Sequence, residues 1–134
     1  MSINVEDVMI TDVITIKPDY PVKYAESMMK YFEVGCLVVV EDGLPIGMIT
    51  DNDIIRRVHK QKHDPHLLTV REVMSQPLLW VEPETPLHEA AQLMIERNLR
   101  RLPVVGSLST GPKLLGLLTR VQMDRVEPEV KAEG

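Results

Sequence analysis

The amino-acid sequence contains an internal repeat, and this feature constrains the fold more than any other. When the sequence is shifted by 65 residues, 10 positions between 5 and 40 are identical to their partners. The first copy contributes Val5, Val8, Met9, Pro18, Pro21, Ala25, Met29, Leu37, Val39 and Val40. Their partners are Val70, Val73, Met74, Pro83, Pro86, Ala90, Met94, Leu102, Val104 and Val105. The chain is therefore two copies of one unit.

A four-residue insertion around Ser107 to Gly111 changes the shift to 69 in the remaining part of the repeat. Beyond the insertion, the first copy's Gly47, Thr50 and Arg56 match Gly116, Thr119 and Arg125. The second copy is therefore expected to have a longer loop, at 106–112.

Each copy predicts the order strand, helix, strand, strand, helix. An extended piece at 13–16, or 78–81, is followed by prolines, and the proline at 21 or 86 suits the start of a helix. Apolar residues with helical spacing follow each of these prolines. Two β-branched runs, 37–40 and 46–50, flank Asp42-Gly43 and indicate a hairpin. Residues 51–58 and 120–126 predict closing helices, so the fold class is α+β.

A unit of this size buries too little surface to be stable alone, since a domain of about 60 residues buries only about 60% of its unfolded surface. We therefore expect the two copies to pack sheet to sheet, with paired clefts between them that favour ligand binding. The predicted organisation is repeat 1 at 1–60, a polar connector at 61–69, repeat 2 at 70–126 and a C-terminal tail at 127–134.

Composition argues against several classes of protein. The net charge of −5 and an aromatic content of only 4% argue against binding of nucleic acid. A single cysteine, Cys36, excludes an intrachain disulfide and a cysteine zinc cluster. The first residues have neither a basic start nor a long apolar run, and 36–40 is too short to span a bilayer. We therefore expect a cytoplasmic protein that has no membrane partner.

The repeated motifs resemble those of the CBS domain, a family named after cystathionine β-synthase. The first copy carries Val8-Met9, Pro18, Ala25, Met29, the run 37–40 and the stretch Gly47-Met48-Ile49-Thr50-Asp51-Asn52-Asp53-Ile54. The second carries Val73-Met74, Pro83, Ala90, Met94, Leu102-Pro103-Val104-Val105 and Gly116-Leu117-Leu118-Thr119. The resemblance covers residues 5–126 and implies two pseudo-symmetric β-α-β-β-α CBS repeats.

The resemblance implies a non-catalytic regulatory module that senses adenine nucleotides or related adenosyl ligands in the clefts between its repeats. It also implies a homodimer formed through the helices. No effector domain follows the repeats, so the output is expected to pass to another, unidentified protein. No cofactor is expected besides the regulatory nucleotide.

The motif Thr50-x-x-Asp53 has two interpretations. A carboxylate at a helix start offers two acceptor oxygens to a ribose diol, and Thr50 adds a hydroxyl for a ribose or phosphate oxygen. Thr and Asp are also common in helix caps, so capping alone explains the spacing. The second copy has Thr119 with Gln122, whose amide has one acceptor oxygen, so we expect the two clefts to be unequal.

The resemblance also implies an adenine pocket, formed in copy one by Tyr20, Ala25, Gly35 and Cys36, and in copy two by Thr85, Ala90, Arg100 and Arg101. The alternative for the two alanines is tight helix packing. Basic residues where phosphates would lie are Arg56, Arg57, Arg100, Arg101, Arg120 and Arg125, although arginines on helices are often solvated.

Three other residue types favour structural roles. His63 and His66, beside a proline in a polar segment, lack the rigid spacing of metal ligands, and His59 and His88 do not supply it, so no metal site is predicted. Cys36 is expected to be a small buried hydrophobe. Trp80 is expected in the core or at a dimer interface.

The sequence is compatible with four functions to different degrees. A regulatory module sensing AMP, ADP, ATP or a related adenosyl compound is the leading one. A structural or assembly module with vestigial clefts, which mediates protein-protein interaction, is the alternative, favoured by Gln122 and Tyr20 and opposed by Thr50-x-x-Asp53. A ligand-gated nucleic-acid binder is disfavoured by the acidic charge. An enzyme is least favoured, since no nucleophile, base and orienting group recur together.

Overall fold

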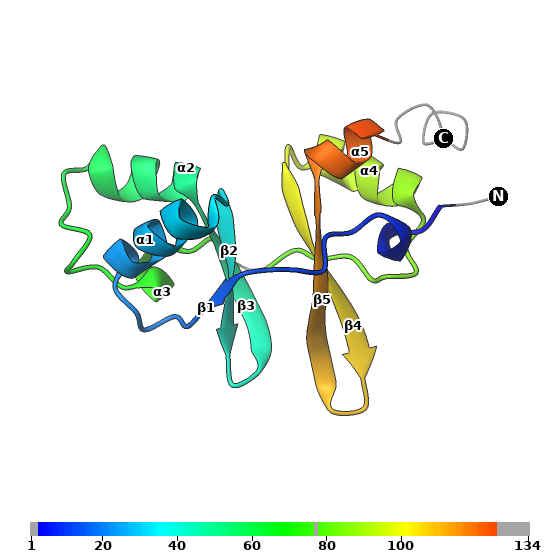
Figure 1. Cartoon of the computed structure of the whole chain (residues 1–134), viewed down its shortest axis with the longest axis horizontal. Coiled ribbons are helices and arrows are strands. Elements are labelled where there is room, and N and C mark those ends of the chain that lie inside the picture. The colour runs from blue at the N-terminus through cyan, green and yellow to red at the C-terminus, as the bar shows by residue number, and fades with distance from the viewer. Residues whose placement is uncertain (1–2, 77, 126–134) are drawn as a thin grey trace. The chain divides into compact units, whose positions relative to one another are not determined.

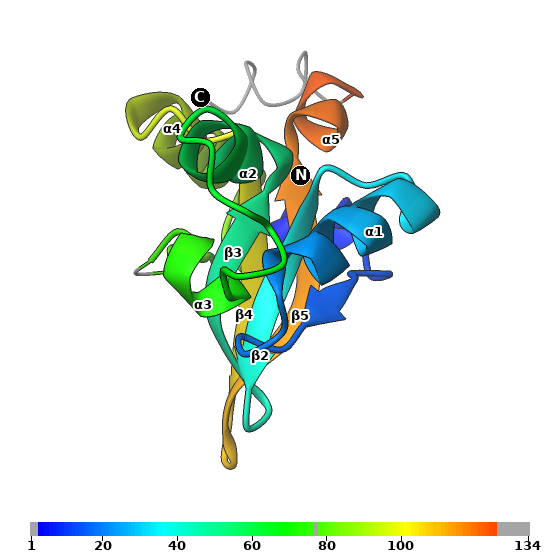
Figure 2. The same cartoon turned by 90° about the vertical axis from the view of Figure 1, so that its left-hand side faces the viewer.

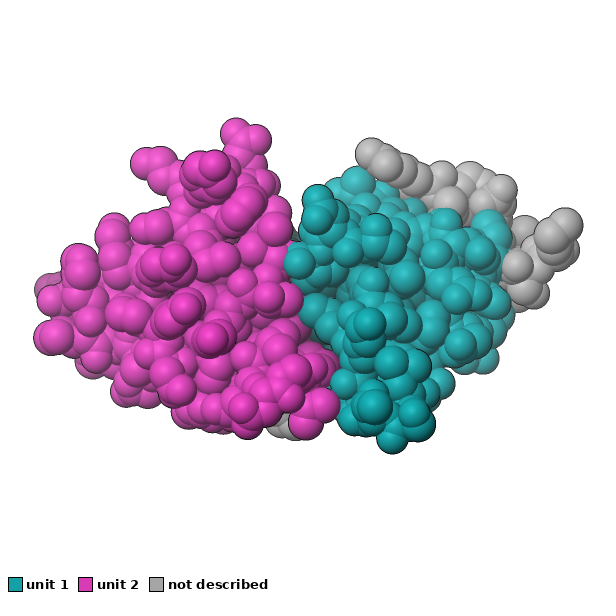
Figure 3. All heavy atoms as spheres, turned by 60° about the horizontal axis from the view of Figure 1, so that its bottom comes forward, with its two compact units in different colours: residues 1–13, 79–134 teal, residues 14–78 magenta. Residues whose placement is uncertain are grey.

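The computed structural model describes residues 3–76 and 78–125, which form two units. Unit 2 runs from Ile14 to Leu78. Unit 1 combines the segment up to Val13 with the chain from Leu79 onward (Figure 3). The expected tail at 127–134 lies outside the described residues.

Unit 2 contains a three-stranded sheet covered on one side by helices (Figures 1 and 2). The strands lie in the order β1-β2-β3, with β1 parallel and β3 antiparallel to β2. They are β1 (Thr15–Ile16), β2 (Cys36–Glu41) and β3 (Leu44–Thr50). The helices are α1 (Val22–Phe32), α2 (Asp51–Ile54), which continues as a π-helical turn at Ile55–His59, and α3 (Val70–Val73).

Unit 1 repeats this plan with one less regular strand. Its elements are a 3₁₀ turn (Val5–Asp7), α4 (Leu87–Glu96), β4 (Arg101–Leu108), β5 (Gly111–Thr119) and α5 (Arg120–Arg125). In place of β1, Val81 makes a single parallel bridge to Val104. The predicted mixed α+β class, with repeats of the β-α-β-β-α type, is confirmed. The helical turns at 5–7 and 70–73 were not predicted.

The two hairpins differ in a way that corrects one expectation. In β2-β3 the predicted turn forms at Asp42-Gly43, whose φ angles of 51° and 80° match the type I′ turn that such pairs favour. The long loop predicted at 106–112 is wrong. The inserted residues instead extend the strands, and the ladder continues to the pair Leu108 and Gly111. Longer strands satisfy backbone groups that a loop would leave to water.

Each unit has its own hydrophobic core beneath its helices. In unit 2 the core packs α1 and the β2-β3 sheet around Ala25, Leu37 and Ile49, all fully buried. In unit 1 the equivalent residues Ala90, Leu102 and Leu118 are also fully buried. Most of the repeated apolar identities are therefore core positions.

The two sequence copies exchange their opening segments between the units. In unit 2 the N–H of Val22, the first residue of α1, donates to the carbonyl of Leu68 at 2.8 Å, and Val70 donates back to Tyr20 at 2.9 Å. In unit 1 Leu87 donates to Ile3 at 2.8 Å, and Val5 donates to Thr85 at 2.9 Å. Each segment thus accepts a hydrogen bond from an N–H group that an isolated helix start would leave unpaired.

The same exchange explains the repeated glycines. A Cβ on Gly47 would lie 2.7 Å from the Met74 sulfur, and one on Gly116 would lie 2.6 Å from the Met9 sulfur. Each methionine belongs to the exchanged segment of the other sequence copy. The Val-Met motifs and the glycines are therefore partners in packing.

Candidate functional site

The best-defined polar site in unit 2 lies where β3 ends and α2 begins. Thr50 is the N-cap, and its Oγ1 accepts a hydrogen bond from the Asp53 backbone N–H at 3.0 Å. In return, the Thr50 backbone N–H donates to Asp53 Oδ2 at 3.1 Å. This reciprocal pair is a capping box, so the capping interpretation of the motif is confirmed.

Capping does not account for all of the contacts of Asp53, which is only 3% exposed. Arg56 donates from Nη2 to Oδ1 at 3.0 Å. The Ser75 hydroxyl lies 3.2 Å from both carboxylate oxygens. A buried carboxylate needs such compensation, because it has lost its hydration.

The equivalent position in unit 1 keeps the backbone contact without a charge. Gln122 Oε1 accepts from the Thr119 backbone N–H at 2.9 Å and from the Thr119 hydroxyl at 2.5 Å. Thr119 therefore holds the Gln122 side chain after β5 in the same way that Thr50 holds the Asp53 side chain after β3. An amide oxygen is sufficient for this contact.

Ser75 is a site residue that the sequence interpretation missed. Ser75 lies in the opening segment of the second sequence copy, but its backbone pairs with that of Met48 in β3. The Ser75 N–H donates to the Met48 carbonyl at 2.8 Å, and the Met48 N–H donates to the Ser75 carbonyl at 3.3 Å. In unit 1 the same place is taken by Ile10, which pairs with Leu117. Only the comparison of Ser75 with Ile10 across the repeat could have signalled a polar role for this position.

The arginines predicted to bind phosphate differ in their hydrogen bonds and in their exposure. Arg57 Nη1 donates to the carbonyls of Val73 and Met74 at 2.9 and 3.2 Å, and so fastens the exchanged segment. Arg120 donates from Nε to the Leu99 carbonyl at 3.2 Å. The side chains of Arg56 and Arg100 are exposed, and that of Arg101 is half-buried. The side chain of Arg125 lies outside the described residues.

The residues expected to form the two adenine pockets have structural contacts of their own. Ala25 and Ala90 are fully buried in the two cores, as the packing interpretation predicts. Cys36 is buried in β2, and the Gly35 carbonyl accepts from the Asp51 N–H at 2.9 Å. Thr85 Oγ1 accepts from the Glu82 N–H at 3.2 Å. Their roles toward a ligand remain predictions.

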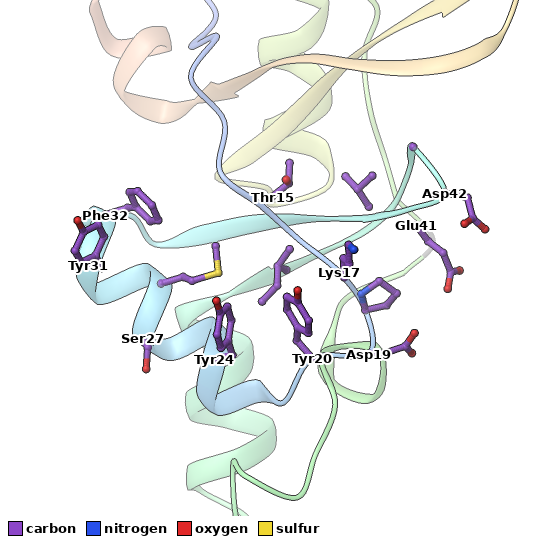
Figure 4. Close-up of a pocket in the computed structure, with 15 residues that line it drawn as sticks. Thr15, Lys17, Asp19, Tyr20, Tyr24, Ser27, Tyr31, Phe32, Glu41 and Asp42 are labelled. Carbon is purple, nitrogen blue, oxygen red and sulfur yellow. The ribbon is translucent and has the colours of Figure 1, made fainter.

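A separate hollow of about 1050 Å³ lies along α1 in unit 2, beside β1 and the β2-β3 turn (Figure 4). Tyr31 and Phe32 lie at one end, and Asp19, Glu41 and Asp42 lie at the other. Tyr20 and Tyr24 lie between the ends, with ring centroids 4.9 Å apart. Among the predicted site residues, only Tyr20 lines this hollow.

The aromatic wall of the hollow is exposed and belongs to one repeat only. Tyr24 is 53% and Tyr31 is 81% exposed. At the equivalent positions α4 carries Glu89 and Glu96, and both are exposed. Tyr24 and Tyr31 are seven residues apart in the predicted helix, a spacing that places them on one helix face, so the sequence did contain a signal for this surface.

The acidic end of the hollow is partly neutralised. Arg71, from α3, pairs with Glu41 and lies 3.5 Å from Asp19. The hydrogen bond that Arg71 donates to Glu41 is the main cause that raises the pKa of Arg71 above its usual value. The ion pair joins the exchanged segment to the tip of the hairpin.

The histidines pair locally. His59 Nε2 lies 2.7 Å from Glu26, and His66 Nδ1 lies 3.1 Å from Asp64. Hydrogen bonds from His66 lower the pKa of the Asp64 carboxyl. Across residues 3–76 and 78–125, no three His, Cys, Asp or Glu side chains gather into a group that could hold a metal ion.

Two further expectations have different outcomes. Cys36 is buried, as expected. Trp80 is 41% exposed, so the expectation that it lies in the core is wrong; its place at an interface stays a prediction. A helix capable of crossing a membrane is absent from the part of the chain that the structure describes.

Comparison with known proteins shows the family. The CBS domain family matches residues 5–60 and 70–125, so the chain belongs to the CBS domain family as a tandem pair. A CBS domain-containing protein of Bacillus subtilis, YhcV, is 42% identical over 102 residues, covering 76% of this chain and 72% of that protein.

Two further relatives differ in how much of their length is matched. An uncharacterized protein of Methanopyrus kandleri is 35% identical over 132 residues, which cover 98% of this chain and 66% of that protein. An inosine-5′-monophosphate dehydrogenase of Methanocaldococcus jannaschii is 32% identical over 116 residues, which cover 85% of this chain but only 21% of the enzyme.

Solved structures share the fold. The hexameric CBS-CP12 protein from bloom-forming cyanobacteria aligns with a TM-score of 0.84 at 27% identity, covering 98% of this chain and 75% of that one. A CBS domain pair solved with 5′-methylthioadenosine and S-adenosyl-L-methionine aligns with a TM-score of 0.82 at 21% identity, over 96% and 98% of the two chains. The second likeness concerns the fold alone.

Proposed function

We propose that this CBS pair is a regulatory module that binds adenine nucleotides or related adenosyl ligands, with Asp53 holding the ribose diol. The observation that carries the proposal is that Asp53 is charged and buried, although the helix cap at this position can form without a charge. Gln122 keeps the backbone contact in unit 1 with a neutral amide, whereas unit 2 buries a carboxylate at 3% exposure. Burial of a charge costs more than burial of an amide, which argues for a purpose beyond capping.

The chemistry of a vicinal diol fits this carboxylate. Two neighbouring hydroxyls donate in one direction, and a carboxylate has two oxygens with about four lone-pair sites to receive them. The position directly after β3, at the first turn of α2, fixes these oxygens through Thr50. That a CBS pair of the same fold was solved with two adenosyl ligands agrees with this chemistry.

We propose that the module is non-catalytic and passes its signal to another protein. The relatives support the idea that a CBS pair is a regulatory module separate from a catalytic domain. The match to the dehydrogenase covers only 21% of that enzyme, so the pair is shared with proteins of other lengths.

We also propose that the chain forms a homodimer through the aromatic face of α1, defined as Tyr20, Tyr24, Tyr31 and Phe32. These side chains are exposed, and α4 folds with glutamates at two of the equivalent positions, so the fold does not require them. Aromatic residues are enriched at the centres of protein interfaces. This face is also the observation that favours the alternative, an assembly module.

Calorimetry tests the proposed ligand class. The purified chain is titrated with AMP, ADP, ATP, S-adenosylmethionine and NADH, and we expect at least one adenosine ligand to bind. Asp53→Asn should weaken that binding by about tenfold or more, because a charge-assisted hydrogen bond contributes about 1.5–3 kcal/mol. Asp51→Asn is the matched control, since it removes an exposed carboxylate two residues away.

Two results would contradict the proposal. Absence of binding by every ligand at millimolar concentration would favour the assembly module. Equal losses in Asp53→Asn and Asp51→Asn would show that general electrostatics, rather than the diol contact, accounts for the effect.

A further inference from the structure

The carboxylate of Asp53 is enclosed by its present partners in this structure. Oδ2 receives the Thr50 N–H at 3.1 Å, and Oδ1 receives Arg56 at 3.0 Å. The Ser75 hydroxyl, which has one hydrogen to donate, lies 3.2 Å from both oxygens. These three donors leave Asp53 only 3% exposed. A ligand hydroxyl can therefore reach the carboxylate only where one of these partners moves away.

The three partners differ in how easily they leave. The Thr50 N–H belongs to the helix cap, and its removal would unwind the start of α2. The backbone of Ser75 is held by hydrogen bonds to Met48, so its side chain stays next to the carboxylate. The Arg56 side chain is 55% exposed and is one turn along the same helix. Water can therefore solvate the guanidinium when it leaves, and a ligand hydroxyl then takes its place on the buried carboxylate, so Arg56 is the partner that can leave.

We propose that Arg56 gates the Asp53 site and makes it select adenosine ligands that carry a 5′-phosphate over uncharged adenosine. This inference rests on the proposed function, in which Asp53 holds the ribose diol. A phosphate attracts a guanidinium strongly, because the two groups form paired, charge-assisted hydrogen bonds. A nucleotide therefore draws Arg56 from Oδ1 and frees that oxygen for its own ribose hydroxyl.

An uncharged adenosine has no group that attracts Arg56. Its diol must compete with the guanidinium for Oδ1, and the displaced guanidinium gains only water. The same arginine thus opposes one ligand and assists the other. Diol and phosphate recognition become coupled through a single side chain, because both occur on one nucleotide.

The ratio of AMP to adenosine affinity is the measurement that isolates this coupling. Titrations at fixed ionic strength use the full chain and its Arg56→Gln, Arg56→Lys and Lys60→Gln variants. We expect AMP to bind the unmodified chain at least about tenfold more tightly than adenosine, as a charge-assisted contact implies. In Arg56→Gln the AMP affinity falls, the adenosine affinity rises or stays constant, and the ratio approaches one.

The other variants separate the gate from simple charge. Lys60→Gln removes an equal, exposed charge one turn further on and should leave the ratio unchanged. Arg56→Lys keeps the charge but loses the paired geometry, so the ratio should lie between the other two values. Thermal melts of each variant show that it is folded.

Failure of the gate is distinguishable from failure of the proposed function. If Asp53→Asn weakens both ligands while Arg56→Gln leaves the ratio unchanged, Asp53 holds the diol and the gate is wrong. If Asp53→Asn changes neither affinity, the diol contact and the gate both fail. If neither AMP nor adenosine binds at millimolar concentration, the gate fails, and the proposed function fails with it only if ADP, ATP, S-adenosylmethionine and NADH do not bind either. A ratio that falls equally in Lys60→Gln would assign the selectivity to overall charge.

Discussion

Each unit has a polar corner where its last strand meets the following helix: Thr50 with Asp53 after β3 in unit 2, and Thr119 with Gln122 after β5 in unit 1. The two polar corners hold the start of the helix with different residues. Both hold the threonine backbone N–H, Thr50 with Asp53 at 3.1 Å and Thr119 with Gln122 at 2.9 Å. Unit 2 places a charge at this position, with Arg56 and Ser75 in contact with it, whereas unit 1 has the neutral Gln122 and has Ile10 in place of Ser75. The difference shows that the fold needs the hydrogen bond to the threonine N–H but does not need the charge.

The helices α1 and α4 also agree where they contribute to the fold and differ where they do not. Both helices bury an alanine in the core at the equivalent position, Ala25 and Ala90. Their exposed faces differ, since α1 presents Tyr24 and Tyr31 where α4 presents Glu89 and Glu96. The buried face is a requirement of the fold, and the exposed face is not.

The largest expected effect comes from giving α1 the exposed face of α4. Tyr24→Glu combined with Tyr31→Glu should abolish self-association, because removing central aromatic residues typically costs about 2 kcal/mol or more each. Sedimentation equilibrium measures this as a shift to a single 15.2 kDa species. Glu89→Gln combined with Glu96→Gln is the control and should leave the association unchanged. A monomeric unmodified chain at micromolar concentration would refute the proposed dimer.

The next effect compares the two glycines that face the exchanged segments. A Cβ at Gly116 would lie 2.7 Å from the Ile10 carbonyl oxygen, whereas one at Gly47 would lie 3.0 Å from the Ser75 carbonyl oxygen. Backbone yields less readily than a flexible methionine, so Gly116→Ala should destabilise the fold more, by about 3 kcal/mol against about 1–2 kcal/mol for Gly47→Ala. Chemical denaturation of both variants checks the ranking. Equal losses would mean that the sulfur contacts alone decide the cost.

The glycines also show how far the sequence could predict the structure. The repeat, the fold class, the Asp42-Gly43 turn and the capping pair at Thr50 follow from local patterns, because spacing and turn chemistry act over a few residues. The exchange of opening segments does not, since no local pattern records which copy a segment packs against. For that reason Ser75 was missed as a neighbour of Asp53. The insertion was misinterpreted because Gly106 and Pro112 indicate a loop, although they lie in paired strands.

The third effect is on affinity and ranks the two polar corners. Asp53→Asn should weaken adenosine-nucleotide binding by about tenfold or more, whereas Gln122→Ala should change the same titration much less. Asn keeps one acceptor oxygen, so the cap and the melting temperature should largely persist. The comparison of affinity with melting temperature in one variant therefore separates diol binding from capping. A larger loss in Gln122→Ala would reverse the ranking.

The smallest effect concerns the capping boxes of the exchanged segments, Asn4 with Asp7 in unit 1 and Thr69 with Glu72 in unit 2. Hydrogen bonds from the Thr69 backbone and side chain lower the pKa of Glu72. A carboxyl with a lowered pKa contributes stability that is fully present above its ordinary pKa and is lost as the pH falls through the lowered value. Glu72→Gln should therefore reduce stability slightly at neutral pH and flatten this part of the acid dependence. Glu6→Gln is the control, because it removes the same charge from an exposed position and should have neither effect. Melting curves measured from neutral to acidic pH compare the two variants. Identical curves for both variants would show that the Thr69 contact contributes nothing measurable.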